Sequence, residues 1–124
     1  MIDDVMTENE RLDVIARIRG ELGDIEQRIP DLRSVISGGE AYSDDSMIAS
    51  RNEANATAMM EIGRLTHRKV ALVEALKKAN DIGICEDCGN DVPYKRYIIN
   101  PATTLCTSCQ EIREIKSKHV RQAA

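Results

Sequence analysis

The hydrophobic residues in the first part of the chain follow a helical heptad pattern. Apolar residues recur there at alternating steps of three and four, which is typical of the a/d seam of a coiled coil. The members of this seam are Ile15, Ile18, Leu22, Ile25, Ile29, Leu32 and Ile36. Thr7 and Glu10 precede it with the spacing of a capping box. The pattern predicts a long first helix.

A second seam predicts another long helix. Its apolar members keep one seven-residue frame, and they are Ile48, Ala58, Ile62, Leu65, Leu72, Leu76 and Ala79. Gly83 fits a C-terminal stop. The intervening SGGEAYSDDS, residues 37–46, is too short for a domain and rich in turn formers. Two long helices joined by such a loop fold back as an antiparallel hairpin. An intermolecular coiled coil would bury the same seams and stays open.

Composition and charge limit the classes of partner. The chain has three tyrosines and no tryptophan or phenylalanine, so aliphatic side chains must do the packing, which suits helix seams. The net charge of -4 is uneven, because residues 1–46 carry twelve acids against five bases. Wrapping nucleic acid requires a basic surface. We therefore expect no sequence-specific DNA binding, and the acidic half favours a basic protein surface as partner.

The sequence gives no sign of a membrane or export segment. No apolar run approaches the ~20 residues of a membrane span. The N-terminal MIDDVMTENE is acidic and lacks the apolar region of a signal peptide. We expect no membrane association and a cytoplasmic location, where thiols remain reduced.

All four cysteines lie in two C-x2-C pairs separated by seventeen residues. This spacing is a zinc pattern, and four thiolates close the tetrahedral shell of a structural site. Gly89, directly after the first pair, suits the positive φ of a tight turn. A reducing compartment disfavours disulfides, and a redox pair would need a βαβ unit that the sequence lacks. We predict one structural zinc per chain, with the ligands Cys85, Cys88, Cys106 and Cys109.

The remaining residues predict the C-terminal helix and argue against catalysis. Thr107 and Ser108 each stand three residues before a Gln or Glu, which predicts a helix starting around Cys109. His67 falls at an outward seam position and His119 in the basic tail, so we interpret both as surface residues. No nucleophile–base motif, phosphate-binding glycine loop or H-E-x-x-H is present, and we expect no enzyme activity.

Together these patterns predict a mainly α fold. Residues 1–83 would form an antiparallel two-helix coiled-coil hairpin with its tip at about 37–46. Residues 84–124 would form a small four-cysteine zinc-finger module with a C-terminal helix.

Residues 75–110, ALKKANDIGICEDCGNDVPYKRYIINPATTLCTSCQ, resemble the DksA/TraR family of bacterial transcription regulators. The shared features are the A-L near the helix end, G-x-C-x-x-C-G, Arg96 five residues before Pro101, and C-x-x-C-Q. The resemblance implies a monomeric regulator that binds bacterial RNA polymerase without reading promoter sequence. It also implies that the hairpin enters the secondary channel of the polymerase and modulates initiation.

The resemblance implies partner contacts at the hairpin tip, where the family often has D-x-x-D-x-A. Counting back from Cys85 places Asp45 on the second aspartate, whereas a shift of two residues matches Asp44 and Ala49. Neither register restores the whole motif. Both aspartates also suit a helix N-terminus, because the dipole and free N–H groups there favour carboxylates.

Some family members also bind guanosine tetraphosphate jointly with polymerase. Lys69 matches one of their basic residues by spacing, whereas Ile62 and Gln110 stand where the family has an arginine and a lysine. Lys69 also fits a seam lysine that extends its ammonium into solvent.

Two other functions stay open. A zinc-dependent adaptor would dock its coiled coil on a different protein, and a dimeric form of it would bury the same seams. A weak zinc-finger nucleic-acid binder would use the bases of the finger module against its five acids; these bases are Lys95, Arg96, Arg113, Lys116, Lys118 and Arg121.

Overall fold

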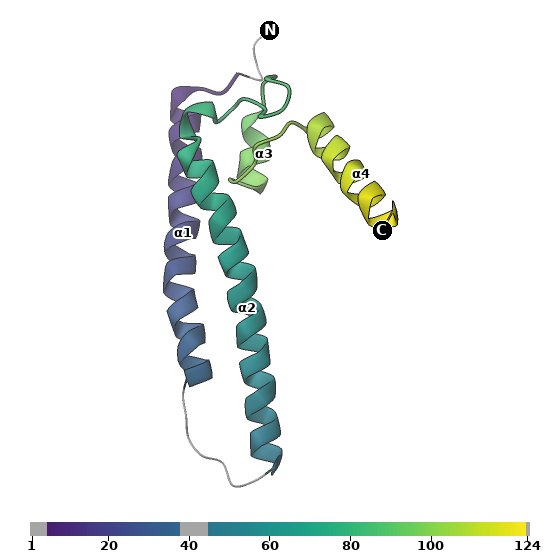
Figure 1. Ribbon diagram of the computed structural model, residues 1–124. Coiled ribbons are helices and arrows are strands. Elements are labelled where there is room, and N and C mark those ends of the chain that lie inside the picture. The colour runs from purple at the N-terminus through teal and green to yellow at the C-terminus, as the bar shows by residue number, and fades with distance from the viewer. Residues whose placement is uncertain (1–4, 38–44, 124) are drawn as a thin grey trace. The chain divides into compact units, whose positions relative to one another are not determined.

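The computed structural model describes residues 5–37 and 45–123, and the side chains of residues 5–36 and 47–118. The elements in chain order are α1 (Glu8–Ser37), α2 (Asp45–Lys77), the 3-10 turn η1 (Ala79–Asp81), α3 (Tyr94–Ile99) and α4 (Thr107–Ala123) (Figure 1). Within these described ranges no strand forms, and Ile84 and Asp91 make an isolated antiparallel bridge. The predicted mainly α fold is confirmed.

Packing groups the chain into two compact units. One unit comprises Met1–Ile18 and Glu74–Ala124, and the other comprises Arg19–Val73. We call the first the finger unit and the second the hairpin unit. Each of the helices α1 and α2 contributes to both units. The sequence-based boundary between residues 83 and 84 stays a prediction.

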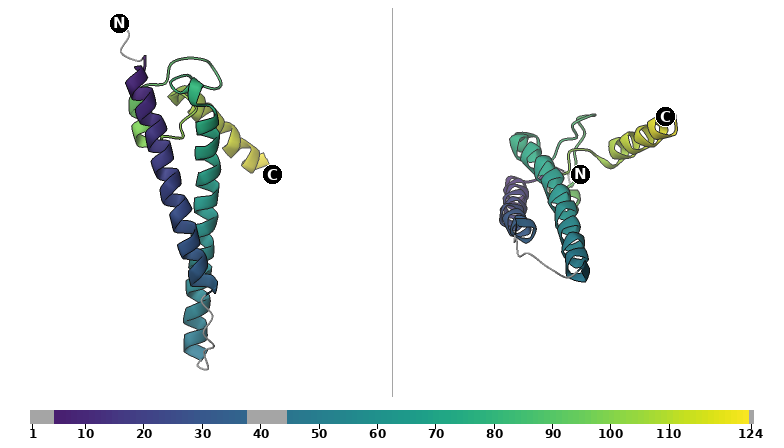
Figure 2. Two further views of the ribbon diagram at one scale, coloured as in Figure 1. Left: turned by 90° about the vertical axis from the view of Figure 1, so that its left-hand side faces the viewer. Right: turned by 60° about the horizontal axis from the view of Figure 1, so that its bottom comes forward.

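The hairpin unit is held by aliphatic side chains between two antiparallel helices, which lie side by side in each view (Figure 2). Its buried seam residues are Leu22, Ile25, Ile29, Leu32, Ala58, Leu65 and Leu72. All seven were predicted from the heptad pattern. The direction of the pairing follows from two contacts: Arg68 bonds the Glu21 carboxylate, and Arg51 donates to the Ile36 carbonyl.

The ends of the seams differ from the prediction. Val14 is fully buried and Ile15 only partly, because these turns of α1 pack within the finger unit rather than along the seam of the hairpin unit. Ile36, Ile62 and Leu76 are half-buried. Ile48 is 41% exposed, near the start of α2.

The second helix also ends earlier than Gly83. Lys78 N–H is shared between the carbonyl oxygens of Glu74 and Ala75, at 3.1 and 3.2 Å, which tightens the last turn. The helix therefore stops at Lys77, and Ala79 lies in η1. Gly83 does adopt a positive φ of 97°, but in the loop that follows η1.

The start of α1 carries the predicted capping box. Glu10 N–H donates to Thr7 Oγ1 at 3.1 Å, and Thr7 N–H donates to Glu10 Oε1 at 3.0 Å. Arg11 then donates to the carbonyl oxygen of Ala79 at 3.3 Å. The first turns of α1 and the turn η1 are thereby joined within the finger unit.

Asp13 connects the same turns of α1 to α3. Its carboxylate accepts hydrogen bonds from Arg17, at 2.7 Å, and from the Tyr94 hydroxyl. The Arg17 bond, followed by the Tyr94 bond, holds the pKa of Asp13 below its usual value. Asp13 is therefore charged at neutral pH and can pair with α3 and its own helix at once.

The hairpin ion pair yields a pH-dependent prediction. Arg68 bonds both oxygens of Glu21, at 2.5 and 3.0 Å, and this bond lowers the pKa of Glu21. A lowered folded-state pKa gives stability that is present above the unfolded pKa and lost as pH falls through the folded value. Because both side chains are part-exposed, we expect Glu21→Gln to lower the free energy of unfolding by about 0.5 kcal/mol at pH 7.

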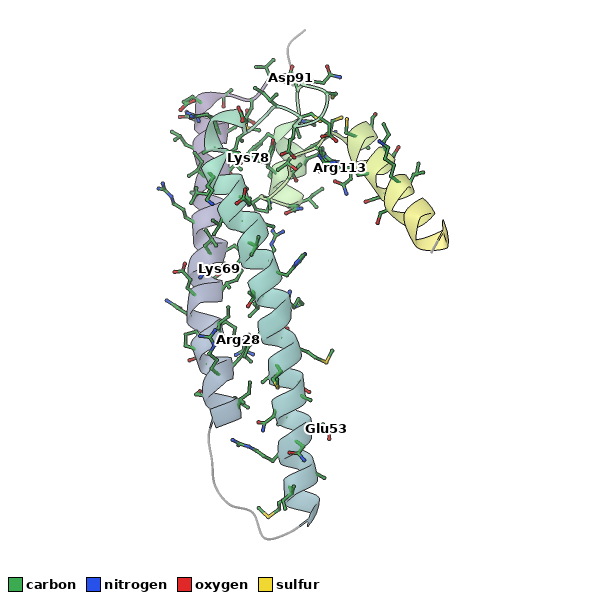
Figure 3. All side chains as sticks on the ribbon, in the orientation of Figure 1. Arg28, Glu53, Lys69, Lys78, Asp91 and Arg113 are labelled. Carbon is green, nitrogen blue, oxygen red and sulfur yellow. The ribbon has the colours of Figure 1, made fainter. Side chains whose placement is uncertain are left out.

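The difference between wild type and Glu21→Gln should be smaller at pH 3 than at pH 7, because this stability is lost as pH falls through the lowered folded-state pKa of Glu21. Urea unfolding at the two pH values measures it. Glu53→Gln is the control, because Glu53 is exposed and has no ion pair among the described side chains (Figure 3). A Glu21→Gln deficit that persists unchanged at pH 3 would contradict the electrostatic origin.

Candidate metal centre

The four cysteines, which lie far apart in sequence, meet in the finger unit. Their Sγ atoms all lie within 4.8 Å of one another, and the Sγ atoms of Cys88 and Cys106 are 3.7 Å apart. Zinc bound at about 2.3 Å to four sulfurs separates those sulfurs by about 3.8 Å. The cluster therefore has the donor atoms and the spacing of a tetrahedral zinc site. All four cysteines are free of disulfides.

The first pair sits on a turn that closes on itself. Cys85 N–H donates to the Asn90 carbonyl at 2.8 Å, and Gly89 N–H donates to the Cys85 carbonyl at 3.0 Å. Gly89 has a φ of 76°, as the sequence predicted. A side chain with a Cβ would strain this left-handed conformation. We call residues 85–90 the first knuckle.

The second pair stands at the start of α4. This helix begins at Thr107 rather than around Cys109, so Cys109 lies in its first turn. Gln110 N–H donates to the Cys106 carbonyl at 2.9 Å, which extends the helical bonding one residue further back. We call residues 105–110 the second knuckle. Glu86 N–H joins the first knuckle to the residue that precedes the second knuckle, by donating to the Thr104 carbonyl at 2.8 Å.

The thiols of the cluster cannot all ionise without a cation. Burial raises the pKa of Cys85, but hydrogen bonds with the backbone at Cys106, Cys88 and Asp87 outweigh it and lower that pKa to about 6. Hydrogen bonding with Cys106, burial and the other two thiols raise the pKa of Cys109 to about 12. One thiolate therefore forms readily while Cys109 keeps its proton. A divalent cation would stabilise all four thiolates, so the donor set fits zinc.

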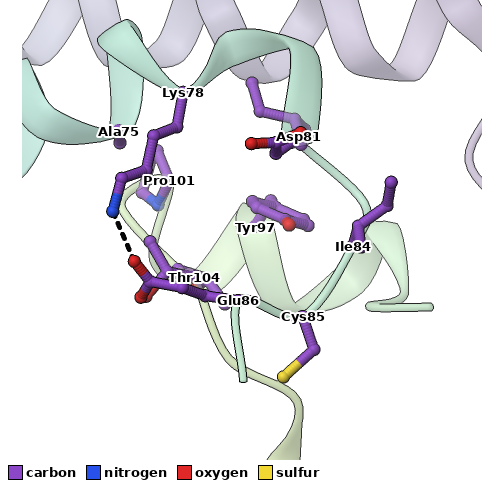
Figure 4. Close-up of a pocket in the computed structure, with 11 residues that line it drawn as sticks. Ala75, Lys78, Asp81, Ile84, Cys85, Glu86, Tyr97, Pro101 and Thr104 are labelled. Atoms are coloured by element: carbon purple, nitrogen blue, oxygen red, sulfur yellow. Dashed lines mark hydrogen bonds and ion pairs between the residues drawn. The ribbon is translucent and has the colours of Figure 1, made fainter. Parts of the chain in front are cut away.

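Paired charges surround the first knuckle. Lys78 and Glu86 form an ion pair at a pocket of about 300 Å³ that Cys85 and Tyr97 also line (Figure 4). Arg113, from α4, bonds both oxygens of Asp87 at 2.6 and 2.9 Å (Figure 3). The two acids next to Cys85 are thus compensated by bases, which limits their repulsion of a thiolate cluster. The sequence did not reveal these pairings.

Tyr97 is a structural residue that the sequence analysis missed. Its side chain is 1% exposed, and its hydroxyl accepts the Gly83 N–H at 2.8 Å. Burial raises the pKa of Tyr97, so the hydroxyl stays protonated at neutral pH. The tyrosine thereby holds the backbone of Gly83, two residues before the first knuckle, in position. Its only sequence signal is its place as one of three aromatic residues.

The other predicted site residues belong to the hairpin unit. Asp44 lies outside the described residues, and Asp45 is the first residue of α2, with its side chain likewise not described. Ala49 is exposed on α2. Lys69 is part-exposed and lies 4.0 Å from Glu26 (Figure 3). The roles of these residues stay predictions.

Within the described part of the chain, the cluster contains four cysteines and no histidine. His67 is exposed, as predicted, and the side chain of His119 lies outside the description. None of the helices in the described part of the chain is both long and apolar enough to cross a membrane.

Comparison with known proteins places the cysteine module. The family model of the prokaryotic dksA/traR C4-type zinc finger matches residues 81–114, which contain all four cysteines. Protein TraR of Escherichia coli K12 is 47% identical over 36 residues, and an uncharacterized 8.5 kDa protein of Escherichia phage 186 is 30% identical over 73 residues. The chain belongs to the DksA/TraR family of C4-type zinc-finger proteins.

The matches to these DksA/TraR relatives differ in extent. The match to the phage 186 protein covers 57% of this chain and 97% of that protein. The match to TraR covers 29% of this chain and 49% of TraR. An uncharacterized 8.2 kDa protein of Escherichia phage P2 is 42% identical over 41 residues, which are 33% of this chain and 55% of that protein. The chain thus spans about half the length of TraR and of the P2 protein.

A solved structure shares the whole fold. Transcription factor DksA2 from Pseudomonas aeruginosa superposes with a TM-score of 0.76, covering 90% of this chain and 88% of its own, at 23% sequence identity. The likeness extends beyond the finger to the hairpin. It supports a shared DksA/TraR architecture for both parts of the chain.

Removing one thiol tests the metal centre. We expect Cys106→Ser to lose tightly held zinc and to disorder residues 84–110, because few apolar residues are buried there and metal binding supplies folding energy. Much of the helical circular dichroism signal should survive, since α1 and α2 pack on each other. Metal analysis and circular dichroism measure both effects.

Ser108→Ala is the matched control, because Ser108 lies between Cys106 and Cys109 and should keep full zinc content. A complete loss of helical signal in Cys106→Ser would show that the hairpin depends on the metal.

Replacing Tyr97 tests the support of the first knuckle. Tyr97→Phe leaves the Gly83 N–H buried without its acceptor, which we expect to cost about 1–3 kcal/mol of unfolding free energy. Ser34→Ala removes an exposed hydrogen bond of 2.7 Å to the Asp31 carbonyl and should cost less than about 0.5 kcal/mol. Denaturant unfolding of the zinc-loaded proteins compares them; equal losses would argue against a special role for Tyr97.

Proposed function

We propose that this protein is a transcription regulator that binds bacterial RNA polymerase in the cytoplasm and inserts its hairpin into the secondary channel to modulate initiation. The observation that carries the proposal is the combination of a C4-type finger with a two-helix hairpin in one DksA-like fold. The related solved structure is named a transcription factor.

In this proposal Cys85, Cys88, Cys106 and Cys109 hold one structural zinc per chain. Bound zinc would cross-link the two knuckles. Four sulfurs leave no open coordination position for a substrate or water. We therefore propose a binding protein without enzyme activity. The finger would orient the surfaces that contact the partner.

The hairpin has dimensions that suit a narrow channel. An α-helix with side chains is 10–12 Å across, so two packed helices measure about 20 Å. The seam residues of the hairpin unit are shared between only two helices, with no third helix among the described elements of that unit. The excess of acids in residues 1–46 fits a partner surface that is basic or holds metal ions. We expect a monomer, which size-exclusion chromatography with light scattering would detect.

The nucleic-acid alternative has less support. Arg96 donates to Leu105 and Thr107 within the finger, and Arg113 is paired with Asp87. Two of the six bases that such a binder would use are therefore engaged internally. Titration with duplex DNA at several salt concentrations distinguishes the two functions, since nucleic-acid binding has a steep salt dependence.

A role for guanosine tetraphosphate also has little support. Lys69 lies near Glu26, Ile62 is half-buried, and the Gln110 amide donates to Glu114 at 3.0 Å. We propose that the nucleotide is not required. Transcription assays with and without it decide the point.

The acidic tip can be tested with one double variant. We expect Asp44→Asn with Asp45→Asn to bind polymerase as wild type but to lose the effect on in-vitro transcription. Binding should persist, because most of the contact area would lie along the helices and the finger. Asparagine still caps a helix and gives up only the dipole attraction, so the stability cost should stay within about 1 kcal/mol.

Affinity for purified polymerase and the transcriptional effect should be measured on the same preparation. Glu53→Gln, a neutralised acid further along α2, should leave both unchanged. Intact binding with intact activity would leave the two aspartates as helix caps. Absence of polymerase binding by wild type at micromolar concentrations would overturn the proposed function itself.

A further inference from the structure

Arg96 lies in α3, between the two cysteine pairs in sequence. Its side chain forms hydrogen bonds with the second knuckle. One terminal nitrogen donates to the Leu105 carbonyl at 3.1 Å, and the other donates to Thr107 Oγ1 at 3.0 Å. Leu105 and Thr107 are the residues on either side of Cys106. The planar guanidinium therefore bonds both neighbours of Cys106 at once.

The base of this side chain is itself held in place. The Arg96 carbonyl accepts the Asn100 N–H at 3.0 Å and the Thr103 hydroxyl at 3.4 Å. Tyr97, the next residue, is almost fully buried. The guanidinium thus extends from a fixed backbone, so its two hydrogen bonds can fix the position of the residues that they reach.

The two knuckles differ in how they are supported. The first knuckle closes through its own backbone, with bonds between Cys85 and Asn90 and between Gly89 and Cys85. The second knuckle has one such backbone bond, from Gln110 N–H to the Cys106 carbonyl. The residues that flank Cys106 receive two further hydrogen bonds from a side chain of α3. The position of Cys106 therefore depends in part on a residue distant from its own turn.

Among the side chains that the structure describes, no carboxylate pairs with the charge of Arg96. Its two hydrogen bonds go to neutral oxygens, and its Nε is buried without a hydrogen-bond partner in the described structure. A zinc ion with four thiolates carries a net negative charge, since four negative sulfurs exceed the charge of the ion. Such a centre would provide the missing negative charge near the guanidinium.

We propose that Arg96 is a positioning residue of the zinc centre, which holds Cys106 in place for the metal through Leu105 and Thr107. The inference rests on the proposed zinc ligation. Residues that support metal ligands from outside the coordination shell commonly change metal affinity by 10–100-fold when replaced. Lysine keeps the charge but cannot donate two hydrogen bonds in a rigid fork.

The rate of zinc release to a chromophoric chelator tests the proposal on the full-length zinc-loaded protein. We expect Arg96→Lys and Arg96→Gln to release zinc about 10–100-fold faster than wild type. Lys95→Gln is the control for charge on α3, because Lys95 is the exposed neighbour. Thr107→Val removes one of the two acceptors and should release zinc faster than Thr104→Val, which removes a hydroxyl that makes no bond to Arg96.

Cysteine alkylation mapped by mass spectrometry separates positioning from general destabilisation. Because Cys85 is buried and Cys106 is partly exposed already, each rate is compared with wild type, and we expect the Arg96 variants to accelerate the modification of Cys106 several-fold more than that of Cys85. Equal acceleration at both cysteines would overturn the proposal, because it would indicate unfolding of the whole finger. Zinc release at the wild-type rate in Arg96→Lys would also overturn it. A wild-type protein that holds no zinc would instead contradict the proposed ligation, independently of Arg96.

Discussion

The mutual repulsion that four crowded cysteine sulfurs would have as thiolates is the constraint on which the finger depends. Sulfurs within 4.8 Å of one another cannot all carry a charge without a cation between them. Between residues 84 and 110, the buried side chains besides Cys85 are Val92, Tyr97 and Leu105. So few apolar groups rarely fold a module unaided. Metal binding therefore converts an electrostatic penalty into the main cross-link of the finger.

The hairpin is limited instead by the scarcity of large aromatic side chains in the chain, and its described core packs with aliphatic residues alone. Without phenylalanine or tryptophan, its core consists of small and medium residues such as Ala58, Leu65 and Ile25. Helices within a protein owe most of their stability to such packing rather than to intrinsic propensity. The part-buried pair of Arg68 and Glu21 fixes which residues meet across the hairpin. Apolar packing thus supplies stability, and the ion pair favours one register.

What the sequence could predict was local periodicity. Heptad spacing gave the buried seam, the Thr7 and Glu10 pair gave the first cap, and the C-x2-C pairs gave the metal cluster. Burial of Val14 rather than Ile15 was missed, because the face of a helix shifts where other segments pack on it. The bonds of Tyr97 and Arg96 were missed for a related reason. They join residues whose proximity arises only when distant turns are assembled.

Packing also groups segments that are far apart in sequence into one compact unit. Arg11 bonds Ala79 of η1, and Asp13 bonds Tyr94 of α3, so the first turns of α1 belong to the same compact unit as the finger. The continuous helix α1 therefore contributes side chains to both compact units. Its first turns depend on contacts with the finger module, whereas its later turns depend on the aliphatic seam with α2. Loss of the metal should accordingly destabilise first the turns of α1 that contact the finger, which contain Arg11 and Asp13.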